Sequence, residues 1–149
     1  MRLDNKGYML ITDFEGFRAE PYLCPAKIAT IGYGNTFYKD GRKVTMIDEP
    51  ITKAEAFDMF KDIADKFAKR VSTCVTSPIN QNQFNALVSF AYNVGVANFM
   101  NSTLLKRVNA NLNDPDIKNQ FLRWNKANGK VLNGLTKRRQ YEAEIYFAG

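Results

Sequence analysis

Histidine is absent from this chain of 149 residues, and cysteine occurs only twice. Without histidine the chain cannot build a Ser/His/Asp triad, a Cys/His protease pair or the histidine ligands of an ordinary catalytic zinc site. Acid–base chemistry near neutral pH must therefore rest on carboxyl, thiol, phenol or amino groups. The two cysteines, Cys24 and Cys74, make no disulfide framework, and we expect free thiols in a reducing compartment. We expect neither a metal nor a cofactor.

Long apolar runs are missing as well, because no stretch approaches the roughly 18 to 20 consecutive apolar residues of a membrane-spanning helix. The first residues carry Asp4, Asp13 and Glu15, and no small-residue cleavage site follows an apolar run. They do not resemble a signal peptide or a signal anchor. We therefore expect synthesis in a cytoplasm and no stable membrane insertion. A substrate outside the cytoplasm would then be reached only with help from another component.

Apolar residues are plentiful, at 45% of the chain against 24% charged residues. This balance predicts a single folded domain over residues 1–149, and we expect a monomer. The net charge is +6, which favours an anionic partner such as nucleic acid, anionic lipid or a cell wall with carboxylates and phosphates. The sequence shows no zinc-finger spacing, no RNP-like aromatic motif and no basic heptad region. We therefore do not expect nucleic acid as the partner.

The hydrophobic periodicity predicts an α+β architecture. Residues 3–14 favour a short helix that Gly16 and Pro21 close, and residues 22–45 are the only β-like part of the chain. Thr52 and Glu55 form a capping-box pattern that begins a long helix to about residue 71. Further helices are expected at 80–95, about 101–110, 114–124 and 136–147.

These elements predict two lobes. A small strand-bearing lobe covers about residues 15–60, and a larger helical lobe covers about residues 1–14 and 70–149. The long helix joins the lobes and leaves an intervening cleft, and clefts are where ligands bind.

Glu15 lies at the end of the first predicted helix, between Phe14 and Phe17 and four residues after Ile11. A carboxyl group at the edge of an apolar face loses part of its hydration, which favours the protonated form that a general acid needs. A solvated glutamate at a helix end would satisfy the same pattern. Taken alone, a cysteine such as Cys24 is more often a small core residue than a catalyst.

A glutamate, a cysteine nine residues later, a threonine six residues after that and then Ile-Gly-Tyr-Gly form a spaced motif. With Glu15, Cys24 and Thr30 in these places, the motif resembles the catalytic signature of phage-type lysozymes, the endolysins of glycoside hydrolase family 24. The resemblance continues through Ala-Tyr-Asn-Val-Gly at 91–95 and through the segments at 102–109 and 121–142. It covers nearly the whole chain in the expected order, and it implies a lysozyme-like fold.

The resemblance implies hydrolysis of the β-1,4 bond between N-acetylmuramic acid and N-acetylglucosamine in bacterial peptidoglycan, leading to lysis of the host. It also implies that the protein acts in the periplasm or cell wall after release from the host cytoplasm, and we expect export through a holin-type pore. Glu15 would be the proton donor, and Cys24 stands where most relatives have aspartate. Cys24 could activate water with inversion, attack the anomeric carbon with retention, or only fill space while Thr30 positions the water. The residues leave these alternatives open.

Four further residues are candidates for contact with the substrate. Tyr33 and Asn35 follow the threonine strand and could line sugar subsites. Asn35 stands where many relatives carry histidine, and we expect this difference to alter local stability more than catalysis. The resemblance also implies that Arg138 or Arg139 reaches toward Glu15. The main alternative to the enzyme is a cell-wall glycan-binding module that has lost catalysis, with the cysteine as the mark of that loss.

Overall fold

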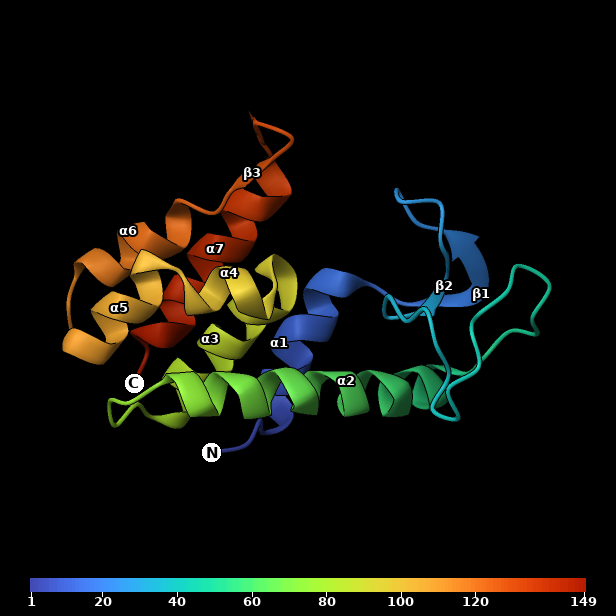
Figure 1. The fold of residues 1–149 in the computed structure, drawn as a ribbon, viewed down its shortest axis with the longest axis horizontal. Helices are drawn as coiled ribbons and strands as arrows, with labels where there is room; N and C mark the ends of the chain where they lie inside the picture. Colours follow the sequence, from blue (N-terminus) through green and yellow to red (C-terminus); the bar gives the residue numbers. More distant parts are fainter.

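The computed structural model describes residues 1–149. Its elements, in chain order, are α1 (Asn5–Glu15), β1 (Arg18–Leu23), β2 (Ala29–Gly32), α2 (Lys53–Cys74), α3 (Gln81–Val94), α4 (Val96–Met100), α5 (Thr103–Ala110), α6 (Asp116–Leu122), β3 (Lys126–Ala127), β4 (Lys130–Val131) and α7 (Asn133–Tyr146). Helix α2 runs along most of the molecule, with β1 and β2 at one end and the other helices gathered at its far end (Figure 1). The expected α+β arrangement with a long connecting helix is therefore present.

Local hydrogen bonds explain where the three main helices begin. Asp4 caps α1 by accepting from the backbone N–H of Gly7. Thr52 and Glu55 form the predicted capping box of α2, in which each side chain bonds the backbone of the other. Asn80 begins α3 with a second capping box that it shares with Gln83. Each box satisfies N–H groups that the first helical turn would otherwise leave without partners.

The strand-bearing lobe is built on an antiparallel pair, β1 and β2, joined by residues 24–28. Lys27 takes a left-handed conformation in this connection, with φ of 62°. Pro21 lies inside β1, where the register between the strands shifts, so the expectation that it closes the first helix is wrong. Proline lacks an N–H for the strand ladder and is tolerated at such irregularities. Gly16 alone ends α1, at φ of 72°.

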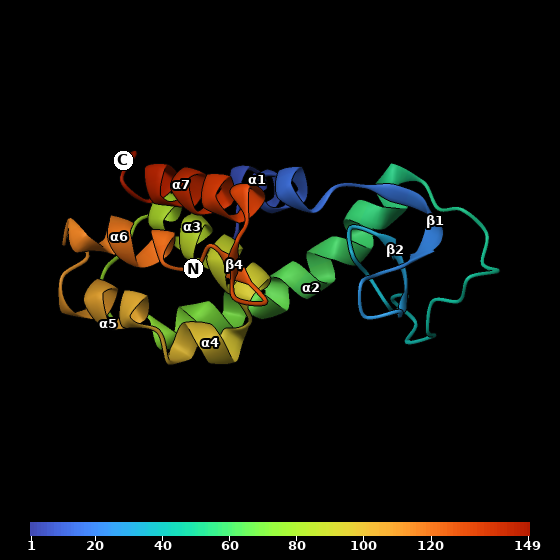
Figure 2. The same cartoon turned by 90° about the horizontal axis from the view of Figure 1, so that it is seen from above.

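The main core surrounds α3, which packs against α1, α2, α4 and α7. Nine consecutive residues of α3, Gln83 to Ala91, are buried. Figure 2 shows α1 and α7 side by side over this helix. A second, smaller cluster of Ile31, Val44 and Met59 lies between the strand-bearing lobe and α2. The main core also reaches into the strand-bearing lobe through Tyr33, so the two lobes pack on the shared helix α2.

Two elements were not expected from the sequence. Helix α4 follows α3 after the single residue Gly95, whose φ of 95° lets the chain turn sharply. A small hairpin of β3 and β4 turns at Asn128 and Gly129, both with positive φ. Residues 22–45 are therefore not the only β region. Strands of two residues are too short to produce a periodic pattern, although an Asn-Gly pair is typical of hairpin turns. None of the helices combines the length and apolar character needed to cross a bilayer.

Candidate active site

Glu15 is the last residue of α1, immediately before the chain crosses to β1. Its side chain is 24% exposed, and its Oε1 accepts a hydrogen bond of 2.9 Å from Nη1 of Arg138 on α7. The guanidinium of Arg138 also stacks on Phe14, with its central carbon 5.3 Å from the ring centre. Glu15 is therefore partly shielded from water and held in place by a cation from another helix.

Arg138 is itself fixed from the other side by buried groups. Its Nε donates to Oε2 of Glu142 at 3.2 Å, and its Nη2 donates to the backbone oxygen of Ser89 at 3.1 Å. The Ser89 hydroxyl donates to the same Glu142 oxygen at 2.5 Å. The side chain of Arg138 is only 5% exposed and that of Glu142 is fully buried. Each nitrogen of the guanidinium thus has a hydrogen-bond partner. These bonds hold Arg138 in one orientation, in which Nη1 is directed at Glu15.

Arg139 lies on the same network but does not reach Glu15. It is fully buried, its Nη2 donates to Asn93 at 2.8 Å, and its Nε lies 2.9 Å from Oε1 of Glu142. That last contact lacks the angles of a hydrogen bond, so it acts as an ion pair. Burial lowers the pKa of Arg139 to about 10, while the Glu142 charge opposes the shift. Arg138, and not Arg139, is the arginine at Glu15, and the expectation that Arg139 contacts substrate is wrong because it has no exposed surface.

The charge state of Glu142 follows from its neighbours. Burial raises its pKa, whereas Arg139, Arg138 and Ser89 all oppose this shift. Guanidinium groups can only donate hydrogen bonds, and one faces each carboxyl oxygen. We therefore infer that Glu142 is a carboxylate.

Tyr92 of α3 is the remaining titratable group near Glu15. Burial raises the pKa of Tyr92 most, and the negative charge of Glu15 raises it further, so the phenol stays protonated.

Cys24 directly follows β1, and Thr30 lies on the paired strand β2, so both residues lie near the β1–β2 connection. Thr30 lies on β2, is buried, and donates from Oγ1 to the backbone oxygen of Ile28 at 2.8 Å. A hydrogen bond from the Ile28 backbone lowers the pKa of the Cys24 thiol, with smaller contributions from the Ala26 backbone and the Thr30 hydroxyl. Cys24 is partly exposed, and its thiol forms no disulfide. The two predicted residues therefore lie on paired segments of the strand-bearing lobe, and the thiol ionises more readily than usual.

Tyr33 and Asn35, in contrast, are buried in the strand-bearing lobe. Tyr33 packs between the rings of Phe17 and Phe60, with centres 5.7 and 5.8 Å away. Asn35 is 2% exposed, and its Oδ1 has no hydrogen-bond partner. Side chains with so little exposed surface offer no face to a sugar, so the expected contacts of these two residues with substrate are wrong. The unsatisfied amide oxygen of Asn35 instead carries a cost in stability.

Cys74 lies too far from Cys24 to form a disulfide with it. Cys74 ends α2, whereas the strand-bearing lobe contacts the beginning of α2, where Gly32 packs on Ala56. Eighteen helical residues from Ala56 to Cys74 span roughly 27 Å at the usual rise per residue. A disulfide needs Cα atoms within about 7 Å. Cys24 and Cys74 therefore do not form a disulfide with each other in this fold.

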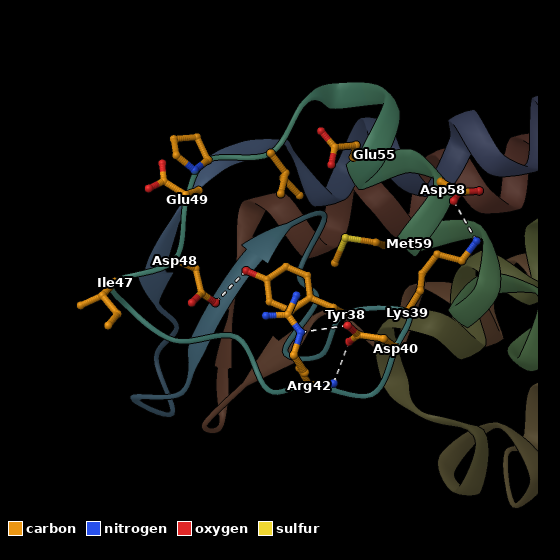
Figure 3. A pocket seen from close by; sticks show the side chains of 12 residues that line it. Tyr38, Lys39, Asp40, Arg42, Ile47, Asp48, Glu49, Glu55, Asp58 and Met59 are labelled. Carbon is orange, nitrogen blue, oxygen red and sulfur yellow. Dashed lines mark hydrogen bonds and ion pairs between the residues drawn. The ribbon is translucent and has the colours of Figure 1, made fainter.

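None of the five main pockets encloses Glu15, Cys24 or Thr30. The pocket of about 720 Å³ in Figure 3 lies between α2 and the loop after β2. Its polar and charged side chains mostly bond one another: Lys39 donates to Asp58, and the Tyr38 hydroxyl donates to Asp48. A pocket of about 450 Å³ is lined by residues of α3 and the β3–β4 hairpin, among them Asn93. No three acidic or cysteine side chains are grouped so that they could hold a metal ion.

Three residues of the site were missed at the level of sequence: Ser89, Asn93 and Glu142. A signal existed for Glu142, which follows Arg139 and Arg138 by three and four residues, and side chains at these spacings meet on a helix. No pattern pointed to Ser89, and Asn93 lies in the Ala-Tyr-Asn-Val-Gly motif, which assigned it no role. Their place is decided by the packing of α3 against α7.

Several known proteins are similar to this chain in sequence and in fold. A family model described as phage lysozyme matches residues 12–142. The chain is 40% identical to the endolysin of Bacillus phage B103, and the alignment covers 100% of this chain and 55% of that protein. It is 34% identical to the endolysin of Acyrthosiphon pisum secondary endosymbiont phage 1, with 98% of each covered. The structure of an endolysin from the Escherichia coli O157:H7 phage FAHEc1 has a TM-score of 0.89 at 38% identity, covering 99% of this chain and 94% of that one.

The fold and this likeness define a lysozyme-like α+β protein, as the sequence predicted. The chain belongs to the phage lysozyme family. It spans about half the length of two curated relatives, the endolysins of Bacillus phages B103 and PZA, at 55% and 56%.

Proposed function

We propose that this protein is an endolysin that hydrolyses the β-1,4 bond between N-acetylmuramic acid and N-acetylglucosamine in the peptidoglycan of its bacterial host. The observation that carries the proposal is Glu15, a partly shielded carboxyl group fixed by Arg138, in a chain of the phage lysozyme family. The endolysin relatives support the same substrate. The proposal places the action of the protein at the cell wall.

In the proposed reaction Glu15 gives its proton to the leaving glycosidic oxygen as the bond to the anomeric carbon breaks. A water molecule supplies hydroxide to that carbon, and its remaining proton is taken up on the opposite side of the sugar. Cys24 and Thr30 serve this water side, supported by their place on paired segments of the strand-bearing lobe and by the lowered pKa of the Cys24 thiol. Arg138 holds the Glu15 carboxyl in one orientation before the sugar arrives.

The test is digestion of purified peptidoglycan followed by mass spectrometry of the fragments. A lysozyme leaves reducing-end muramic acid, whereas 1,6-anhydromuramic acid would indicate a lytic transglycosylase and overturn the proposed reaction. Glu15→Gln should lower the rate by at least roughly 10²-fold, because proton transfer is lost. Asp13→Asn removes an exposed carboxyl from the same helix and should leave the rate unchanged.

The fate of the anomeric configuration decides the role of Cys24. Proton NMR of the first product distinguishes inversion, in which water attacks directly, from retention through a sugar bonded to sulfur. A protein that binds peptidoglycan without cutting it, in both wild-type and Glu15→Gln forms, would be the glycan-binding module instead.

A further inference from the structure

The ion pair at Glu15 continues into the protein as a chain of alternating charges, which we call the arginine–glutamate network: Glu15, Arg138, Glu142 and Arg139. Arg138 bonds Glu15 through Nη1 and Glu142 through Nε. The Glu142 carboxylate therefore competes with Glu15 for the charge of one guanidinium. Glu142 itself is fully buried and touches no solvent, so the proposed reaction does not use it as an acid or base.

We propose that Glu142 is a positioning residue that fixes Arg138 beside Glu15 and offsets one of the two arginine charges, so that α7 presents a charge of +1 and not +2 to the Glu15 carboxyl group. The proposal rests on the proposed hydrolase activity of Glu15. Buried carboxylates are costly unless paired, and this one has a partner on each oxygen. A purely apolar residue could fill the same volume, but it would leave two guanidinium groups acting on Glu15 without an opposing charge.

The charged and titratable groups that face this network are few. Helix α7 supplies Arg138, Arg139 and Glu142, and α1 supplies Glu15. Helix α3 carries no charged side chain and contributes only the phenol of Tyr92 and the neutral groups of Ser89 and Asn93. On α6, which also packs on α7, Asp116 is engaged by Gln120 and Arg107. The charge that acts on Glu15 is therefore set by α7.

The charges on α7 predict shifts of opposite sign in the ionisation of Glu15 for two variants, Glu142→Gln and Arg139→Gln. In the wild type, two arginines and Glu142 present a charge of +1 to Glu15. Glu142→Gln raises it to +2, which favours the Glu15 carboxylate, so the proton donor is lost at a lower pH. Arg139→Gln lowers it to 0, which favours the protonated form to a higher pH. The double variant restores +1. A residue that only stabilises the fold would not produce shifts of opposite sign.

The experiment is the pH dependence of kcat/KM on solubilised peptidoglycan for the four proteins. The alkaline limb should move down by on the order of one pH unit in Glu142→Gln and up by a similar amount in Arg139→Gln. In the double variant the alkaline limb should return close to its wild-type position. The double variant removes both members of the buried Glu142–Arg139 pair, so it still tests the proposal if either single variant folds poorly. Glu144→Gln removes an exposed charge from the same helix and should leave the limb in place.

The titration midpoint of the Glu15 side-chain carboxyl carbon, followed by NMR, gives a readout that needs no activity. Its midpoint should move in the same two directions. Alkaline limbs and midpoints that stay at the wild-type pH in both single variants, or that move in the same direction, would overturn the proposal. A wild-type protein that cuts no peptidoglycan would refute the proposed function alone, because the NMR midpoints would still test the charge coupling.

Discussion

Gly7→Ala in α1 should destabilise the protein, although helix propensity predicts the reverse. Alanine is favoured over glycine in helices by up to about 1 kcal/mol. At Gly7, however, a Cβ would lie 2.5 Å from Oδ1 of Asn85 and 2.8 Å from Cδ2 of Leu3. Both distances are far shorter than van der Waals contact, so either α1 or Asn85 must move.

The cost can be estimated from what Asn85 holds. Asn85 is buried, donates to Asp4 at 2.7 Å and accepts from Gln81 at 2.9 Å. Overpacking of a buried site costs about 1 to 3 kcal/mol, and each weakened hydrogen bond about 1 kcal/mol. After the propensity gain is subtracted, Gly7→Ala should lower the free energy of unfolding by roughly 1 to 3 kcal/mol.

Urea denaturation followed by circular dichroism measures this change. Gly134→Ala is the matched control, because Gly134 also lies in the first turn of a helix, α7, but no atom lies within 4 Å of the place that an alanine methyl group would take there. It should be neutral or stabilising by up to about 1 kcal/mol. If Gly7→Ala were as stable as Gly134→Ala, the close approach of α1 to α3 would be refuted as the deciding effect.

The other predictions concern the thiols and the core. Alkylation of Cys24 by iodoacetamide should reach its half-maximal rate below the pH typical of a free cysteine, since a lowered pKa leaves more thiolate at a given pH, and Thr30→Val should move that midpoint upward. Lytic activity should be unchanged by reductant and by Cys74→Ser, and activation by reductant would contradict the separation of the two thiols. Phe90→Ala should lower the free energy of unfolding, measured in urea titrations, by about 3 to 5 kcal/mol. Phe90 is fully buried among the rings of Phe99, Phe121 and Trp124. A loss below about 1 kcal/mol would show that this core is loosely packed.

Local signals were sufficient for much of this fold. The capping pattern at Thr52 and Glu55 placed the start of α2, because a capping box depends only on residues within one helical turn. The spacing of Glu15, Cys24 and Thr30 identified the family, which the family model and the relatives confirm. The lack of histidine had already narrowed the groups available for acid–base catalysis to carboxyl, thiol, phenol and amino groups.

Contacts between distant segments could not be predicted in this way. Tyr33 and Asn35 follow the motif directly, yet the packing of the strand-bearing lobe on α2 buries both of them. Arg138 and Arg139 are adjacent in sequence, and the packing of α7 in the helical lobe brings one to Glu15 of α1 and the other to Asn93 of α3. The residue types of the site were thus determined by the sequence, whereas the burial and charge balance around Glu15 arise from helices more than one hundred residues apart, and only the tertiary structure decides them.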